Sequence, residues 1–351
     1  MNGRIGGKYR RAWFWIVLAL LVLLLTFVFV LMRLLPPLPD PAGMILINRS
    51  ENGMGRAYWL DPATGILTPL QGEDTMNRPD LAPDGNQIVY VNWPGLAIYN
   101  LSTRRIQQII TVERDSDPNW SPDGHSIVFV HSRDFSSALF LYDMTTHERH
   151  QLTDYQNDLE PDWSPDGQRI VFTSSRDGFQ ELYTIKPDGT DRQRLTHNTG
   201  LNDLMASYSP DGQYIAYMTN YSVGDNSGEI WVMKADGTEQ VQITDNDHYD
   251  FYPIWSPDGR YIVFSGKTAE TDIDIFVYDF LAEQVHQITA LATIDANPIW
   301  SPNSEWIAFV SYTSNGQQSQ IYIVRPDGSS LAPVVDVSRS YSLLLWIASF
   351  E

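Results

Sequence analysis

A tetrapeptide that recurs along most of the chain constrains its fold more than any other feature of the sequence. Ser-Pro-Asp-Gly occurs four times, and two looser copies, Ala-Pro-Asp-Gly and Ser-Pro-Asn-Ser, extend the series to six. The prolines of successive copies are 39 to 47 residues apart, at positions 83, 122, 165, 210, 257 and 302. A nearly constant period in this range is typical of proteins that are built from repeated supersecondary units.

The sequence around each tetrapeptide predicts four short strands per repeat. Each copy leads into an apolar alternation such as Ile127-Val128-Phe129, followed by a second apolar run, a turn and a Leu-Thr or Ile-Thr pair. Four such strands make one blade of a β-propeller. We interpret the tetrapeptide as the hairpin turn between the first two strands, since proline fixes φ, aspartate bonds to local backbone and glycine tolerates positive φ. The bulky residues before the copies are expected to pack between blades: Trp120, Trp163, Tyr208, Trp255 and Trp300.

The two ends of the repeat region are expected to share one blade. Residues 44–71 have the pattern of three strands, and Leu343–Ile347 has the pattern of a first strand without partners. Pairing these segments would close the ring and remove exposed sheet edges. Six internal units and this composite predict an all-β, seven-bladed β-propeller over residues 43–351, with about 44 residues per blade. The alternative is a six-bladed propeller with a loose hydrophobic tail, which leaves residues 44–71 without a place.

Residues 12–32 form an apolar segment in which Thr26 is the only polar residue. As a helix this segment would be roughly 31 Å long, which matches the hydrocarbon core of a bilayer. A buried core helix would normally show a polar stripe, and a cleaved signal peptide would have a shorter apolar stretch before a small-residue cleavage site. We therefore predict a transmembrane signal anchor, with a basic tail at residues 1–11 and a Pro-rich linker at residues 33–42.

Charge divides the chain into two contrasting parts. The 351 residues include 23 basic and 43 acidic ones, but the first 33 residues contain five basic and no acidic ones. Four basic residues precede the apolar segment, so the positive-inside rule predicts a cytoplasmic N-terminus and a periplasmic or extracellular propeller. The rest of the chain carries a net charge of −25. This charge argues against nucleic-acid binding, and the absence of cysteine excludes disulfides and thiolate metal sites.

The repeat resembles a known family. The pattern Pro-x-Trp-Ser-Pro-Asp-Gly-x-x-Ile-x-Phe over Pro161–Phe172 is similar to the repeat of TolB-like propeller proteins. The same repeat type occurs in the propeller domains of prolyl-oligopeptidase-type peptidases. The resemblance covers roughly residues 43–351 and implies the propeller fold, but it implies little about function because propellers host many unrelated roles. The TolB family itself is soluble and periplasmic with an additional N-terminal domain, whereas here a membrane anchor is predicted.

The sequence contains none of the common catalytic motifs. It has no Gly-x-Ser-x-Gly, no phosphate-binding loop and no His-Glu-x-x-His, and its seven histidines are scattered among different units. We therefore expect a protein- or ligand-binding or scaffolding module rather than an enzyme, with envelope or cell-surface proteins as partners. The alternative is an extracytoplasmic hydrolase or lyase that acts on a peptide or polysaccharide.

One position, five residues before the bulky residue, carries aspartate in five consecutive units. It should open the innermost strand, so that five carboxylates ring one mouth of the central channel. These carboxylates either accept hydrogen bonds from loop amides or bind a cation such as Ca²⁺ or a basic group of a partner, and the two roles are compatible. No other cofactor is expected. The five candidates are Asp115, Asp158, Asp203, Asp250 and Asp295, and the same face is expected to include Asp117, Glu160, His248, Tyr249 and Tyr252.

Overall fold

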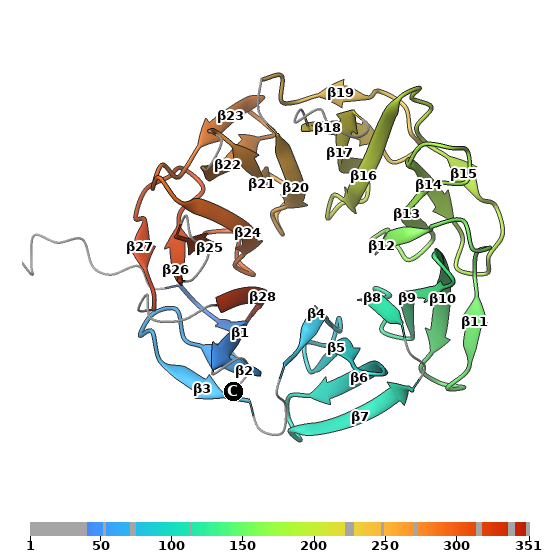
Figure 1. Ribbon diagram of the computed structural model, residues 1–351, viewed down its shortest axis with the longest axis horizontal. Helices are drawn as coiled ribbons and strands as arrows, with labels where there is room; N and C mark the ends of the chain where they lie inside the picture. The colour runs from blue at the N-terminus through green and yellow to red at the C-terminus, as the bar shows by residue number, and fades with distance from the viewer. Residues whose placement is uncertain are drawn as a thin grey trace, which may run out of the picture. The chain divides into compact units, whose positions relative to one another are not determined.

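The computed structural model describes residues 41–51, 54–70, 75–111, 114–221, 228–246, 249–269, 272–313, 318–335 and 341–348. The regular structure of these residues is all β-strand, and they belong to one compact unit, Pro41–Glu351. Its sheets follow one another around a central axis in a propeller-like arrangement (Figure 1). The described residues contain no helix with the length and apolar character of a membrane span. The predicted tail, anchor and most of the linker lie outside these residues.

Most of the strands form antiparallel sheets of four, in which sequential strands are neighbours. The first four sheets after the N-terminal strands are β4 (Asn77–Leu81), β5 (Gln87–Asn92), β6 (Gly95–Asn100) and β7 (Arg105–Ile110); β8 (Asp115–Trp120), β9 (Ser126–Arg133), β10 (Ser136–Asp143) and β11 (Arg149–Gln151); β12 (Leu159–Trp163), β13 (Ile170–Ser174), β14 (Glu181–Ile185) and β15 (Gln193–Arg194); and β16 (Leu201–Tyr208), β17 (Tyr214–Tyr221), β18 (Gly228–Lys234) and β19 (Val241–Gln242).

The next eight strands form one larger sheet, because a single parallel pair, Ile273 with Ile294, joins two groups of four. These strands are β20 (Asp250–Trp255), β21 (Tyr261–Lys267), β22 (Ile273–Asp279), β23 (Gln284–Gln287), β24 (Ile294–Trp300), β25 (Ile307–Tyr312), β26 (Ser319–Val324) and β27 (Ala332–Pro333).

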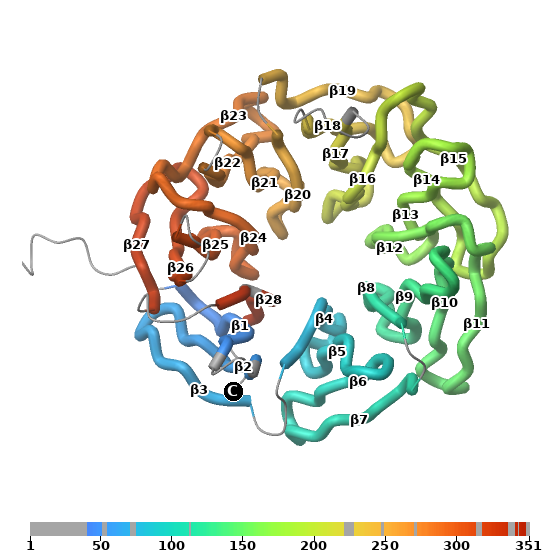
Figure 2. Tube along the Cα trace, in the orientation of Figure 1, coloured from blue at the N-terminus to red at the C-terminus, as the bar shows by residue number. Residues whose placement is uncertain are grey.

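The remaining sheet combines both ends of the described chain, as the sequence predicted. Its order is β28 (Tyr341–Ile347), β1 (Met44–Glu51), β2 (Met54–Leu60) and β3 (Leu67–Pro69). The colours at the two ends of the chain therefore meet in one sheet in the tube drawing (Figure 2). Antiparallel pairing runs from Met44 with Ile347 to Arg49 with Tyr341, so β1 begins where β28 ends. The indole Nε1 of Trp346 also donates a hydrogen bond to the carbonyl of Ala42, at 3.2 Å.

The repeated tetrapeptide forms the turn between the first two strands of each internal repeat, which confirms its predicted role. The Ser121 hydroxyl donates to the Asp123 carboxylate at 2.6 Å, and the Ser126 amide donates to the Ser121 hydroxyl at 2.9 Å. The same contacts recur in the later copies. Gly124 has a φ of 71°, a left-handed conformation that glycine adopts without steric cost. The fold therefore uses these Asp and Gly residues as turn residues.

The Leu-Thr and Ile-Thr pairs fasten the outermost strand of a sheet to its neighbour. The Thr153 hydroxyl accepts a hydrogen bond from the Leu139 amide at 2.9 Å. The same bond joins the corresponding residues of three later units at the same distance. A buried amide that would otherwise lack a strand partner is thereby satisfied.

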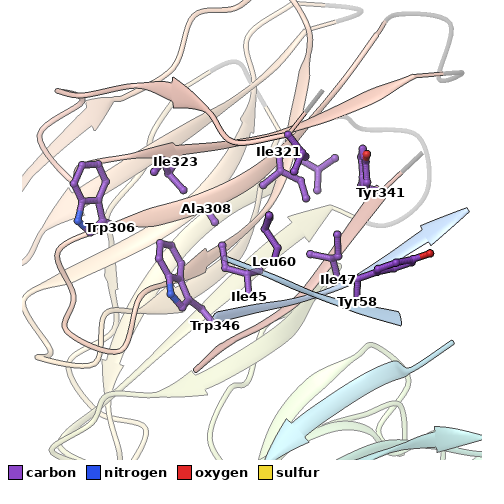
Figure 3. Close-up of a cluster of buried hydrophobic side chains, with 12 residues drawn as sticks. Ile45, Ile47, Tyr58, Leu60, Trp306, Ala308, Ile321, Ile323, Tyr341 and Trp346 are labelled. Carbon is purple, nitrogen blue, oxygen red and sulfur yellow. The ribbon is translucent and has the colours of Figure 1, made fainter. Parts of the chain in front are cut away.

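Apolar clusters lie between neighbouring sheets and join them into one body. The bulky residues before the tetrapeptides are 5% to 7% exposed and belong to these clusters, as predicted. The cluster at the ring closure joins the composite sheet to β25 and β26 through residues such as Ile45, Trp346 and Trp306 (Figure 3). Each sheet therefore buries its faces against two neighbours, as expected for a propeller-like ring.

We expect Trp346→Ala to destabilise the propeller strongly, because its indole is 7% exposed and fills the closure cluster. The free energy of unfolding should fall by about 3–5 kcal/mol, as for other large-to-small substitutions in cores. Denaturant unfolding of the purified full-length protein measures this change. Trp93→Ala is the control, since Trp93 is 71% exposed and should change stability little. Equal effects of the two substitutions would contradict a stabilising role for the closure cluster.

Candidate functional site

Each innermost strand contains a bulge that directs side chains toward the centre of the ring. In β4, β8, β12, β16, β20 and β24 the register shifts three residues before the bulky residue or its equivalent. The residue at this point has a positive φ of 46° to 57° in all six strands. The residues are Arg78, Asp117, Glu160, Met205, Tyr252 and Asn297. Repeating such a bulge around a ring places six side chains of different chemistry against one central space.

A cavity of about 480 Å³ occupies this space. All six bulge residues line it, and the other lining residues come from the same six strands. Among its walls are the carboxylates of Asp80 and Asp162, the apolar side chain of Ile254 and the ring of Tyr252, which is 46% exposed. Four acidic and one basic side chain make the cavity electronegative. It therefore suits a cationic group.

Hydrogen bonds across neighbouring sheets already engage part of this charge. The Arg78 guanidinium forms an ion pair with Asp117, across the boundary between β4 and β8. Glu160 accepts a hydrogen bond from the Met205 amide at 2.8 Å, across the boundary between β12 and β16. Four of the six bulge residues thus connect neighbouring sheets while they line the cavity.

Asp80 and Asp162 join sheets in the same way and have perturbed pKa values. The Trp120 amide donates to Asp80 at 2.6 Å, and the Tyr208 amide donates to Asp162 at 2.8 Å. Burial raises the pKa of Asp80 to about 7, although the Trp120 amide partly offsets this effect. Burial likewise raises the pKa of Asp162 to about 6, although the hydrogen bond from the Tyr208 amide partly offsets this effect. The charge of the cavity therefore changes between pH 5 and 8.

The five aspartates predicted from the repeat lie elsewhere in the same strands. Each lies directly before its innermost strand or among the first three residues of it, but each is at most 4% exposed and none lines the cavity. Asp115 contacts His131 Nδ1 at 2.6 Å, and Asp203 accepts hydrogen bonds from Thr219 and Asn198 at 2.7 Å. Asp250 accepts a hydrogen bond from Asn246 at 2.8 Å.

These contacts hold the aspartates inside their own sheets. The Thr293 hydroxyl donates to Asp295 at 2.9 Å, and burial raises the pKa of Asp115, Asp203 and Asp295. Structural hydrogen bonding is therefore observed for all five positions that carry aspartate. Cation binding by them stays a prediction.

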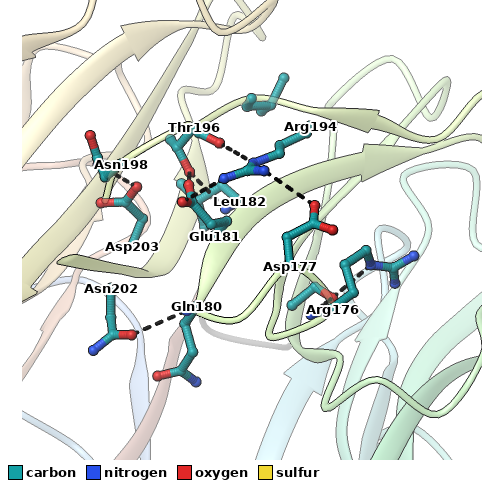
Figure 4. Close-up of polar contacts among 12 residues, drawn as sticks. Arg176, Asp177, Gln180, Glu181, Leu182, Arg194, Thr196, Asn198, Asn202 and Asp203 are labelled. Carbon is teal, nitrogen blue, oxygen red and sulfur yellow. Dashed lines mark hydrogen bonds and ion pairs between the residues drawn. The ribbon is translucent and has the colours of Figure 1, made fainter. Parts of the chain in front are cut away.

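Asp158 has the strongest partner of the five. The Arg176 guanidinium binds both of its carboxylate oxygens, at 2.9 and 2.7 Å. The following residue, Asp177, instead contacts Arg194, which reaches Glu181 at 2.8 Å (Figure 4). Arg176 and Asp177 lie in the turn that follows β13, and their side chains bind these separate partners. Both arginines make contacts within their own sheet, where each joins neighbouring strands.

The other residues that were expected on the same face as the five aspartates lie in different places. Asp117, Glu160 and Tyr252 line the cavity, whereas Tyr249 packs beside Phe251 with ring centroids 5.5 Å apart. His248 lies outside the described residues. Within the described part of the chain, no group of three or more His, Asp or Glu side chains is arranged to hold a metal ion.

Sequence reasoning found Asp117 and Glu160 only as neighbours of the aspartate series, and it missed Asp80 and Asp162. The bulge is the reason, because an extra residue breaks the alternation from which the inward face of a strand is inferred. Asp80 and Asp162 also share a position that is not acidic in the other units, so comparing repeats does not reveal them. The sequence offers a signal only in the third unit, where Asp or Glu precedes Trp163 at one and at three positions.

Comparison with known proteins agrees with this architecture. Residues 67–271 and 204–343 match the TolB beta-propeller domain. The chain belongs to the TolB beta-propeller family. The Tol-Pal system protein TolB of Alcanivorax borkumensis is 32% identical over 75 residues, which cover 20% of this chain and 17% of that protein. The chain thus matches less than a fifth of the length of this relative.

Solved structures show the same fold in other TolB-like and enzyme propellers. A putative TolB from Agrobacterium tumefaciens is 23% identical, with a TM-score of 0.52 over 68% of this chain and 87% of that one. An oligogalacturonate lyase in complex with manganese is 19% identical, with a TM-score of 0.67 over 80% of this chain and 85% of that one. Similarity at this level shows the fold alone.

We expect Asp80→Asn to stabilise this TolB-family propeller at pH 8 by about 1–2 kcal/mol, after allowance for partial exposure. A carboxyl group with a raised pKa binds its proton more tightly in the folded state than in the unfolded state. Its contribution to stability is complete below the pKa of the unfolded state and is lost as pH rises through the folded pKa of about 7. Asparagine is neutral at every pH and can still accept the Trp120 amide. Denaturant unfolding should show a gain at pH 8 that shrinks toward pH 4.

The control for this experiment is Asp188→Asn, in a turn where hydrogen bonds from Thr190 lower the carboxyl pKa. Its carboxylate stabilises the folded state above the unfolded pKa, so the substitution should not stabilise the protein at pH 8. A loss of stability in Asp80→Asn at pH 8 would contradict the raised pKa.

Proposed function

We propose that the protein is a membrane-anchored, seven-bladed propeller outside the cytoplasm that binds a ligand or partner, and that the channel cavity receives a cationic group of it. The observation that carries this proposal is the cavity itself, with Asp80, Asp117, Glu160 and Asp162 converging from three sheets. A single arginine, Arg78, offsets this charge and is paired with Asp117. Preorganised carboxylates in a partly enclosed space attract a cation more strongly than the same groups on an open surface.

The blade count and the anchor belong to the same proposal. We take the eight-stranded sheet as two blades, because one parallel residue pair alone links its halves. Residues 12–32 then hold the ring at the membrane through the linker at 33–42, with the N-terminus in the cytoplasm. The five inner-strand aspartates support the strand ends, and any cation that they bind would lie beside the cavity.

Hexalysine is a suitable probe of the cavity. We expect calorimetry with the full-length protein in dodecyl maltoside to show micromolar binding at pH 8 and at least fivefold weaker binding at pH 5.5. Protonation of Asp80 and Asp162 explains the direction, since it removes negative charge as pH falls through about 7 and about 6. Asp80→Asn/Asp162→Asn should weaken binding at pH 8 to a similar extent and should reduce the pH dependence.

The matched control is Asp188→Asn/Asp236→Asn, which removes two charges from exposed turns outside the cavity. Asp158→Asn/Asp203→Asn/Asp250→Asn tests the predicted aspartate ring in the same assay, if thermal unfolding shows that this variant folds. Equal weakening by control and cavity variants would mean that only net charge attracts the peptide, and the cavity proposal would fail.

Reporter fusions test the proposed topology. Alkaline phosphatase fused after residue 42 should be active, because that point is expected outside the cytoplasm, and a cytoplasmic reporter at the same place should be inactive. Changing Arg4, Lys8, Arg10 and Arg11 to glutamine should lower phosphatase activity, since the orientation depends on these charges. The opposite reporter pattern in the unaltered protein would overturn the anchor's orientation.

A further inference from the structure

Three successive sheets expose an aromatic side chain at the same kind of hairpin tip. Trp93 lies between β5 and β6 and is 71% exposed. Phe135 lies between β9 and β10 and is fully exposed. Phe179 lies before β14 and is 39% exposed. None of the three belongs to the buried clusters between sheets. We call these residues the aromatic tips.

The aromatic tips lie at one end of the ring. Asp115, which begins β8, pairs with His131 near the end of β9, just before Phe135. Likewise Asn77 pairs with Val91 just before Trp93, and Leu159 pairs with Thr173 before Phe179. All three tips therefore lie at the end where the innermost strands begin. The tetrapeptide turns lie at the opposite end, where these strands finish.

Folding alone does not account for the tips. Phe135 has a φ of 70°, a conformation that glycine or asparagine adopts more easily than an aromatic residue. A fully exposed phenylalanine in this conformation forms no core. Exposed aromatic residues gathered on one face are instead typical of a surface that binds another molecule.

Exposed arginines accompany the tips. Arg114 directly precedes β8, and Arg133 directly precedes the turn that carries Phe135. The Arg133 guanidinium lies over the ring of Tyr155, 4.5 Å from its centroid, while Asp134 is 3.9 Å away. Tryptophan, tyrosine and arginine are enriched among the residues that dominate binding energy at protein interfaces, and phenylalanine is enriched in interfaces generally.

The first described strand begins at the end of the ring opposite the aromatic tips. Met44, which follows the linker closely, pairs with Ile347 at the finishing end of β28. Because residues 34–351 carry a net charge of −25, an acidic partner would be repelled from most of the propeller and attracted near Arg114 and Arg133.

We infer that the aromatic tips with Arg114 and Arg133 form a docking surface for a protein partner that presents apolar side chains among carboxylates. The inference rests on the proposed binding function, but it uses a surface other than the channel cavity. Tip aromatics supply apolar contact area, and the two arginines select for acidic sequences.

The test uses full-length protein in dodecyl maltoside, immobilised through its N-terminus, and a phage-displayed library of 12-residue peptides. We expect enrichment of peptides that combine aromatic or aliphatic residues with aspartate or glutamate. Trp93→Ser/Phe135→Ser/Phe179→Ser should weaken the binding of synthetic copies at least tenfold. Arg114→Glu/Arg133→Glu should weaken it similarly and should remove its salt dependence.

The matched control is Ile66→Ser/Val241→Thr/Leu281→Ser, which removes three apolar side chains that are 57% to 78% exposed outside the aromatic tips. This control should bind within twofold of the unaltered protein, and thermal unfolding should show that all variants fold. If the library yields no peptide whose binding depends on the aromatic tips, the inference is overturned. Tip-dependent binding of phosphatidylethanolamine–phosphatidylglycerol vesicles or of polygalacturonate, without peptide binding, would also overturn it.

The hexalysine assay separates this inference from the proposed cavity site. If hexalysine binds the cavity variants as strongly as the unaltered protein while peptide binding requires the aromatic tips, the cavity proposal fails and the docking surface stands. If the cavity binds hexalysine and the tips bind no peptide, the docking surface fails alone.

Discussion

Packing of each sheet against its two neighbours is the interaction on which the rest of the structure depends. A twisted sheet of four short strands cannot bury both of its faces alone, so its apolar side chains require a sheet on either side. In an open row the first and last sheets would expose one face and an unpaired edge. The pairing of β28 with β1 solves both problems, because it places the two ends of the described chain in one sheet. Trp346 and Trp306 then fill the interface with β25 and β26.

Closure of the ring brings the innermost strands together, and the bulges determine what they present there. Positive φ at the same position in six innermost strands directs one short segment of each of these strands into the cavity. Carboxylates at these positions also accept backbone amides of the next sheet, as Asp80 does from Trp120. The same side chains therefore hold neighbouring sheets together and give the cavity its charge. The raised pKa values of Asp80 and Asp162 are the energetic consequence of burying charge where both roles meet.

The sequence was most informative where one residue type has one mechanical role. The Ser-Pro-Asp-Gly turns, the bulky inter-sheet residues and the composite sheet were all predicted, because each follows from local geometry repeated at a constant period. Prediction of the site was less complete, since the bulge breaks the two-residue alternation of a strand. The aspartates that repeat, such as Asp158, are fastened to partners in their own sheets. Asp80 and Asp162, which do not repeat, line the cavity.

This contrast follows from how a repeat fold is built. Residues that every unit needs for its own strands recur along the chain, so recurrence identifies structural parts such as the strand-end aspartates. A binding surface is formed once per ring from several units, so its residues differ from unit to unit and escape a search for repetition. The cavity and the aromatic tips have this property: Arg78, Glu160 and Tyr252 occupy equivalent bulges, and Trp93, Phe135 and Phe179 lie at hairpins of different sequence. In such a protein, departures from the repeat at equivalent positions are therefore the better guide to function.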